Sequence, residues 1–172
     1  MGHHNVQTPG SPSPPVRSIS MATIILCTDI NASAQKCFDL SRAVDIHLQS
    51  TRHTSERVVA GRSSGLFELG DVVTWEAKHF GIKQRLTVKI TKMEAPHFFE
   101  DVMQKGAFKS MRHEHHFEEK GGKTIMKDVF CYETPLGIAG NIFDALVLKR
   151  YMTRFLILRN EVIKKVAENG TL

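Results

Sequence analysis

The chain has 172 residues, of which 41% are hydrophobic and 24% charged, and its formal net charge is +5. This size and composition are typical of one globular domain with a substantial core. The most apolar stretch, residues 142–158, carries four charged side chains, so we expect no membrane-spanning helix. The moderate positive charge is too small to indicate a nucleic-acid partner, and we expect none.

The cysteines and the short motifs narrow the class of protein further. Cys27, Cys37 and Cys131 are widely spaced, and no secretory pattern precedes them, so we expect reduced thiols and a cytoplasmic location. The sequence contains no phosphate-binding glycine loop, nucleophile elbow or zinc-protease helix motif. We therefore predict no cofactor, and the oligomeric state stays open.

Residues 1–20 are rich in glycine, proline and serine and hold few large apolar side chains. Such a segment buries too little apolar surface to offset the entropy that ordering costs. We predict a disordered leader, either native or added to the N-terminus, followed by a single domain at residues 21–172.

The domain opens with a predicted strand at residues 22–26. Asn31 and Ser33 can cap a helix, and the apolar residues that follow recur at steps of three and four. This spacing predicts a bent helix or a pair of short helices between Ser33 and about Thr51. These apolar residues are Cys37, Phe38, Leu40, Val44 and Leu48.

A period of two follows and predicts strands. Residues 73, 75, 77 and 79 share one face, and we expect the face that holds Trp75 to point inward. After a turn at Gly81, residues 82–91 alternate between apolar and polar side chains, as a half-buried strand does. Three further strands are predicted at residues 97–104, 108–119 and 123–134, so at least five consecutive strands form an antiparallel meander.

The last element is an amphipathic helix from about Ile138 to Asn169, which ends at Gly170. We predict an α+β helix-grip fold, in which a curved antiparallel sheet wraps around this long C-terminal helix and two short N-terminal helices complete the domain. The basic residues of the helix are interpreted as its solvated face; the alternative is a surface that docks on acidic partners. They are Lys149, Arg150, Arg154, Arg159, Lys164 and Lys165.

Three segments carry a resemblance to a known superfamily: Val72–Gly81 (VVTWEAKHFG), Gly106–His115 (GAFKSMRHEH) and Asp128–Gly137. Together with the order of elements between Thr23 and Ala167, they resemble the START-like or SRPBCC superfamily. This superfamily includes polyketide cyclases and the birch-pollen-allergen fold, and the segments are most similar to an uncharacterised bacterial branch. The resemblance implies a ligand-binding cavity between sheet and helix, without naming a ligand.

The densest group of chemically active side chains lies around residues 113–117. The two-residue period places His113, His115 and Phe117 on the inward face. If Gly121-Gly122 form a hairpin loop, His115 faces Asp128 across the strand pair, and His113 faces Phe130.

Three interpretations of these side chains remain open. They form a structural hydrogen-bond network, or His115 and Asp128 form an oriented base with His113 or Tyr132 as a second proton-transfer group. In the third interpretation His113 and His115 bind a metal ion with Asp128 or His79; we predict no metal.

The leading hypothesis is a protein that binds a small hydrophobic or aromatic molecule or a lipid in the cavity. The alternative is an enzyme of the polyketide cyclase or dehydratase type, and a metal site or an interaction protein with a basic C-terminal helix is less favoured. The predicted ligand-binding residues are Trp75, His79, Gln84, Phe99, Asp101, His113, His115, Phe117, Asp128, Phe130, Tyr132 and Phe155.

Overall fold

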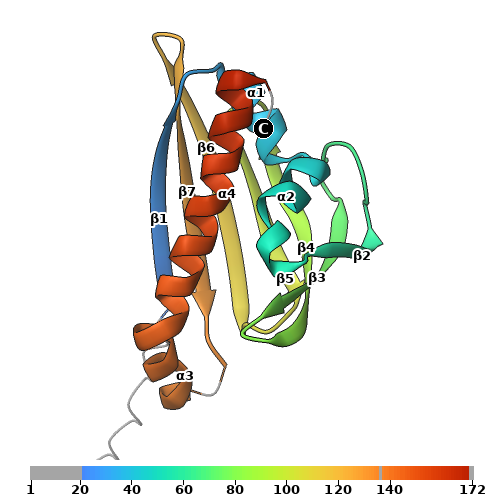
Figure 1. Ribbon diagram of the computed structural model, residues 1–172, viewed down its shortest axis with the longest axis vertical. Helices are drawn as coiled ribbons and strands as arrows, with labels where there is room; N and C mark the ends of the chain where they lie inside the picture. The colour runs from blue at the N-terminus through green and yellow to red at the C-terminus, as the bar shows by residue number, and fades with distance from the viewer. Residues whose placement is uncertain (1–20, 136, 171–172) are drawn as a thin grey trace, which may run out of the picture.

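The computed structural model describes residues 21–135 and 137–170, so the predicted leader lies outside the described residues. One antiparallel sheet of seven strands forms the body of the molecule, in the order β1-β7-β6-β5-β4-β3-β2 (Figure 1). The strands are β1 (Ala22–Ile30), β2 (Arg57–Gly61), β3 (Val72–His79), β4 (Ile82–Glu94), β5 (Phe98–Lys105), β6 (Ser110–Lys120) and β7 (Lys123–Glu133). The predicted meander of five consecutive strands is confirmed as β3 to β7.

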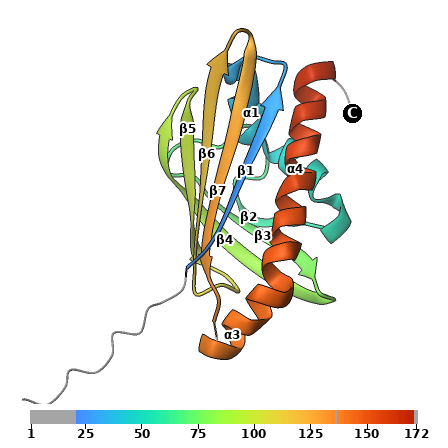
Figure 2. The same ribbon diagram turned by 90° about the vertical axis from the view of Figure 1, so that its left-hand side faces the viewer.

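Helices cover one face of this sheet. The long α4 runs the length of the sheet, and α1 and α2 lie beside it (Figures 1 and 2). The helical elements are α1 (Ala34–Ser41), α2 (Val44–Ser50), the 3-10 helix η1 (Arg52–Thr54), α3 (Gly137–Phe143), the π-helix η2 (Asp144–Leu148) and α4 (Lys149–Asn169). This arrangement confirms the predicted α+β helix-grip fold with two short N-terminal helices.

Alternation along the strands explains which face they bury. In β6 the side chains of Met111, His113, His115 and Phe117 are buried, whereas their neighbours are more exposed. The two-residue period of a strand sends such a set to one side of the sheet. That side faces α4, so the core forms between the sheet and the helices.

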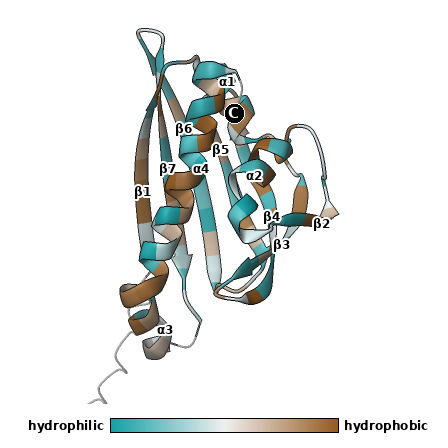
Figure 3. Ribbon diagram, in the orientation of Figure 1, coloured by the Kyte–Doolittle hydropathy of each residue, from teal (hydrophilic) through white to brown (hydrophobic). Residues whose placement is uncertain are grey.

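The last helix is held to the sheet by one apolar stripe. Leu156, Ile163 and Ala167 are buried, and bands of hydrophobic and hydrophilic residues alternate along the helix in Figure 3. Burying a leucine or isoleucine side chain stabilises a fold by about 1.5–3 kcal/mol, so an Ile163→Ala substitution would weaken this contact. The helix ends at Gly170, whose φ of 75° lies in the left-handed region that glycine tolerates.

The predicted long C-terminal helix is confirmed, with one irregularity near its beginning. α3, η2 and α4 follow one another without a break, and the π-helical segment η2 is the part that the sequence did not predict. The Tyr132 hydroxyl donates a hydrogen bond to the Asp144 carboxylate in this segment, which ties it to the end of β7. The apolar side chains of Ile142, Phe143 and Leu146 are exposed here.

Among the helices of residues 21–135 and 137–170, none is both long and apolar enough to cross a membrane.

Candidate functional site

A cavity of about 410 Å³ lies between the sheet and the C-terminal helix. Its wall comes mainly from β3 to β7 on one side and from α4 on the other. Most of the lining side chains are apolar or aromatic, and a few polar groups are gathered at two places. The apolar wall includes Phe67, Val73, Trp75, Leu86, Val88, Ile90, Phe99, Phe130, Phe155 and Leu156. Ligand-binding cavities have this size and composition.

Most of the predicted ligand-binding residues line this cavity: Trp75, His79, Gln84, Phe99, Asp101, His113, His115, Phe130 and Phe155. The exceptions are Phe117, Asp128 and Tyr132. All three point inward as predicted, but they are packed behind the cavity wall.

Local packing explains each exception. Phe117 meets the ring of Phe38 edge to face at 5.7 Å and belongs to the closed core. Tyr132 is fully buried, and its hydroxyl donates a hydrogen bond to Asp144. Asp128 is also fully buried and lies behind the two histidines. These three residues therefore lack direct access to a molecule in the cavity.

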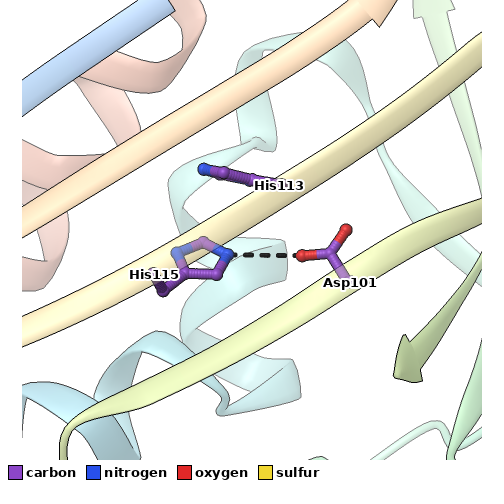
Figure 4. Close-up of side chains that lie close together, drawn as sticks. All are labelled: Asp101, His113 and His115. Carbon is purple, nitrogen blue, oxygen red and sulfur yellow. Dashed lines mark hydrogen bonds and ion pairs between the residues drawn. The ribbon is translucent and has the colours of Figure 1, made fainter. Parts of the chain in front are cut away.

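The first polar group, which we term the His–Asp cluster, consists of Asp101, His113, His115 and Asp128. Asp101 lies opposite His113 in the pairing of β5 with β6, and His115 lies opposite Asp128 in the pairing of β6 with β7. Figure 4 shows His115 and Asp101 facing each other, with the His113 side chain beside them. The predicted register of the β6–β7 hairpin is thus confirmed.

Both histidines contact the same buried carboxylate. The distance from His113 Nε2 to Asp128 Oδ1 is 3.0 Å. His115 Nδ1 lies 2.8 Å from the same oxygen, although the angles there do not suit a hydrogen bond. The other nitrogen of His115, Nε2, lies 3.3 Å from Asp101 Oδ2. His115 therefore lies between two carboxylates: Asp128, which is packed behind the cavity wall, and Asp101, which lines the cavity.

Residues of the C-terminal helix complete this cluster. Asn160 Nδ2 donates a hydrogen bond of 2.6 Å to Asp128 Oδ2. Arg159 Nη1 lies 3.7 Å from Asp128 Oδ1, and Arg159 Nη2 donates a hydrogen bond of 3.0 Å to the carbonyl oxygen of Ser41. Asp128 thus receives contacts from β6 and from the helix, and its position is fixed from both sides.

Burial and hydrogen bonding shift the pKa values of these groups in opposite directions. Burial on its own raises the pKa of Asp128, but hydrogen bonds and charges from His113 and His115 outweigh it and hold the pKa well below its ordinary value. The same balance lowers the pKa of Asp101. Burial, reinforced by the neighbouring His115, lowers the pKa of His113 to about 4. At neutral pH the cluster therefore holds two ionised carboxylates and a neutral His113.

The interpretation of the helix's basic residues as a solvated face is wrong for Arg159, which is buried and lines the cavity. A signal for this was present in the sequence. Leu156, Arg159, Ile163 and Ala167 follow one another at steps of three and four, which is the period of the buried face of a helix. Asn160, also buried, was missed in the same way.

The second polar group, the rim cluster, consists of His47, Glu56, His79 and Tyr151, all of which line the cavity. His79 Nδ1 and the Tyr151 hydroxyl are 2.7 Å apart. His47 stacks on the indole ring of Trp75 with ring centroids 4.1 Å apart. Its Nε2 lies 3.5 Å from Glu56 Oε1, which is too long for a strong hydrogen bond.

Glu56 is the unusual member of the rim cluster. Only 7% of its side chain is exposed, and its Oε2 has no hydrogen-bond partner among the described residues. Burial raises the pKa of this carboxyl, but His47 and Thr51 outweigh the effect, so the pKa lies below its ordinary value. A buried, ionised oxygen without a partner is costly, and a donor group on a bound molecule would supply the missing hydrogen bond.

Sequence comparison and structure comparison give different results. No protein-family model and no curated protein matches the chain. Solved structures do match: a START superfamily protein from Mycobacterium smegmatis has a TM-score of 0.66 at 12% identity, covering 87% of this chain and 99% of its own. Ginseng major latex-like protein 151 from Panax ginseng has a TM-score of 0.64 at 17% identity, covering 86% and 97%. A protein from Thermus thermophilus has a TM-score of 0.65 at 19% identity, covering 83% and 97%.

The chain has a START-type fold. This confirms the predicted resemblance to the START-like superfamily at the level of the fold. All these identities lie below 20%, so they show the fold alone. Within this fold, the cavity of the chain carries two polar clusters. The His–Asp cluster can accept or transfer protons, and the rim cluster can accept a hydrogen bond. Most of the remaining wall provides apolar contact.

Proposed function

We propose that the protein binds a small hydrophobic or aromatic molecule, or a lipid, in the cavity between sheet and C-terminal helix. The observation that supports this most directly is the cavity itself, with a volume of about 410 Å³ and a wall that is mostly apolar. A concave apolar surface of this extent favours an apolar occupant. The START-type fold supports ligand binding in general.

The proposed roles of the residues follow from their positions. Trp75, Phe99, Phe130 and Phe155 provide aromatic surface for the body of the ligand. The His–Asp cluster, on the sheet, and the rim cluster, which takes His79 from β3 and Tyr151 from α4, orient the polar atoms of the ligand. We also propose that the protein acts in the cytoplasm, which is consistent with its three free cysteines.

Intrinsic fluorescence offers a direct test, because Trp75 is the only tryptophan of the chain and lines the cavity. We expect anilinonaphthalene sulfonate and a medium-chain fatty acid to bind saturably and to change the Trp75 emission. Replacing Ala77, a small buried residue of the cavity wall, by Phe fills part of the space. Ala77→Phe should weaken binding by at least about tenfold, equivalent to about 1.4 kcal/mol.

The matched control is Ala60→Phe, which adds the same side chain at an exposed position of β2. Its affinity should equal that of the unmodified protein. Equal weakening by both variants, or by neither, would mean that the probes bind outside the cavity, and the proposal would then fail. Comparison of the native and denatured masses of the purified protein would show directly whether a small molecule copurifies.

An enzyme of the cyclase or dehydratase type is the second candidate, and the placement of His115 supports it. This side chain lines the cavity and has a carboxylate near each ring nitrogen, which suits a proton-transfer group. Asp128→Asn separates the two functions, because a base that depends on Asp128 for its orientation loses turnover. A binding protein would retain most of its affinity for the probes.

A further inference from the structure

We propose that Asp101, His113 and His115 bind a divalent transition-metal ion of the first row on the wall of the cavity. One ligand atom from each residue lies within 4.8 Å of the other two. All three residues line the cavity, so an ion has a route to them. The sequence placed Asp101 on the cavity wall but named Asp128 or His79 as the third ligand of a possible site, and we predicted no metal; the structure places Asp101 beside the two histidines.

The spacing between two of these atoms favours a shared ion. His115 Nε2 and Asp101 Oδ2 are 3.3 Å apart. A charge-assisted hydrogen bond is usually shorter, about 2.7–2.9 Å. Two ligand atoms bound tetrahedrally to one ion at about 2.1 Å stand about 3.4 Å apart. The third atom, on His113, lies within 4.8 Å of both.

Asp128 does not bind the ion in this proposal; it orients the two histidines that do. Such histidines almost always give their other ring nitrogen to a carboxylate or carbonyl, which fixes the ring. Here His113 Nε2 and His115 Nδ1 both lie within 3.0 Å of Asp128 Oδ1. Asp128 is itself fixed by Asn160. This fixed carboxylate holds both rings against the wall beside Asp101.

The charges of the cluster also leave room for a cation. Asp101 and Asp128 contribute two negative charges, and Arg159 contributes one positive charge beside Asp128. Asp101 has His115 as its sole hydrogen-bond partner among the described residues. An ion bound to Asp101 would neutralise this excess at the point where it faces the cavity.

The donor set selects the kind of ion. Two imidazole nitrogens and one carboxylate oxygen suit zinc or iron(II), whereas magnesium and calcium prefer oxygen ligands throughout. Three protein ligands leave at least one coordination position open toward the cavity. An oxygen atom of a bound molecule can occupy that position.

Titration of the full-length, chelator-treated protein with Zn²⁺ in a calorimeter tests the site. His3 and His4, near the N-terminus, are replaced by Ser in every sample, because they can bind zinc on their own account. We expect one equivalent of Zn²⁺ with a submicromolar Kd. Co²⁺ should give the visible absorption bands of a tetrahedral or five-coordinate ion. The Asp101→Asn and His115→Ala variants should each bind at least 100-fold more weakly.

Two further variants make the result specific. His116→Ala removes a histidine from the same strand, but this side chain is partly exposed and contacts Glu114, so Zn²⁺ affinity should not change. Asp128→Asn should weaken binding by about 10–100-fold through the orientation of the rings. Asp101→Asn keeps the volume of the side chain on the cavity wall, and a melting curve of the metal-free variant confirms that it folds.

Absence of stoichiometric Zn²⁺ binding would overturn the proposal. So would binding that survives both Asp101→Asn and His115→Ala, because the ion would then be elsewhere. The experiment uses no cavity ligand, so its failure would leave the proposed binding of an apolar molecule untouched. Failure of the fluorescence test would likewise leave the metal site standing.

Discussion

Asn160 on α4 donates a hydrogen bond of 2.6 Å to Asp128 on β7, two residues that are 32 positions apart in the chain. Both side chains are buried. Asp128 is also hydrogen-bonded to His113. The bond from Asn160 therefore connects the C-terminal helix to the polar wall of the cavity. The orientation of the helix and the positions of the histidines therefore depend on one carboxylate.

Loss of the Asn160 amide should destabilise the fold. Asn160→Ala leaves Asp128 without one of its hydrogen bonds in a buried position, which costs about 2 kcal/mol. Urea unfolding followed by circular dichroism measures this loss. The exposed neighbour Glu161 provides the control, since Glu161→Ala should change the free energy of unfolding by less than about 0.5 kcal/mol. Equal stability of both variants would show that the bond to Asp128 contributes little.

Arg159 is predicted to matter far more than other basic residues of the same helix. Arg159→Met removes the buried cation beside Asp128 and the hydrogen bond to the Ser41 carbonyl. Removing one partner of a buried ion pair costs about 3 kcal/mol or more. Arg154→Met, at an exposed position, should have almost no effect on the midpoint of urea unfolding. A small effect at both positions would contradict the structural role given to Arg159.

The stability of the metal-free protein should fall between pH 6.5 and pH 4. His113 has a pKa of about 4 in the folded protein, below its ordinary value of 6.5. In this interval the unfolded chain takes up a proton that the folded protein excludes, so acid favours unfolding. The full difference corresponds to about 3 kcal/mol. Asp101 and Asp128, whose pKa values are also lowered, add to the loss at more acidic pH.

Urea unfolding at several pH values in the presence of a chelator measures this slope. His113→Phe keeps an aromatic ring and removes the titrating group, so stability should depend less on pH in this interval, whatever its value at pH 7. Burial also lowers the pKa of His79, and a smaller slope should therefore persist in the variant. An unchanged slope would mean that His113 has the same pKa in the folded and the unfolded protein.

Glu56 should favour ligands that carry an O–H or N–H group. Its unpartnered Oε2 can accept a hydrogen bond from a molecule in the cavity. A hydrogen bond to a charged group contributes about 1.5–3 kcal/mol, which is at least about tenfold in affinity. An aromatic alcohol should therefore bind at least tenfold more tightly than its methyl ether, as measured by Trp75 fluorescence. Glu56→Leu should remove this difference, and a preference that remains would assign it to another group.

The sequence predicts most of the sheet and much of the cavity wall. Alternation in β4 and β6 determines which side chains face inward, and Gly121-Gly122 fixes the register that brings His115 opposite Asp128. Such local patterns suffice because a hairpin pairs residues that are close in the chain. Asp101 also falls on the predicted face, since Phe99 and Asp101 both line the cavity.

Contacts between distant elements are harder to predict. Glu56 lies in a connection between η1 and β2, where no periodicity marks it as buried. The spacing along the helix marks the position of Arg159 as inward, but its partners Asp128 and Ser41 come from β7 and α1, which the sequence does not bring together. The exclusion of Phe117 and Tyr132 from the cavity depends on Phe38 and on Asp144, which lie in separate helices. A charged or aromatic residue alone does not reveal such partners.

The pairing of the first strand has a consequence for how the chain folds. β1 pairs with β7, and Thr23 meets Cys131, which follows 108 residues later. During synthesis, which starts at the N-terminus, β1 is therefore made long before its partner strand β7. Pairing over such a distance slows folding and leaves a strand edge open to other chains in the meantime. We expect shortening of the chain before β7 to cause aggregation, even though six of the seven strands would remain.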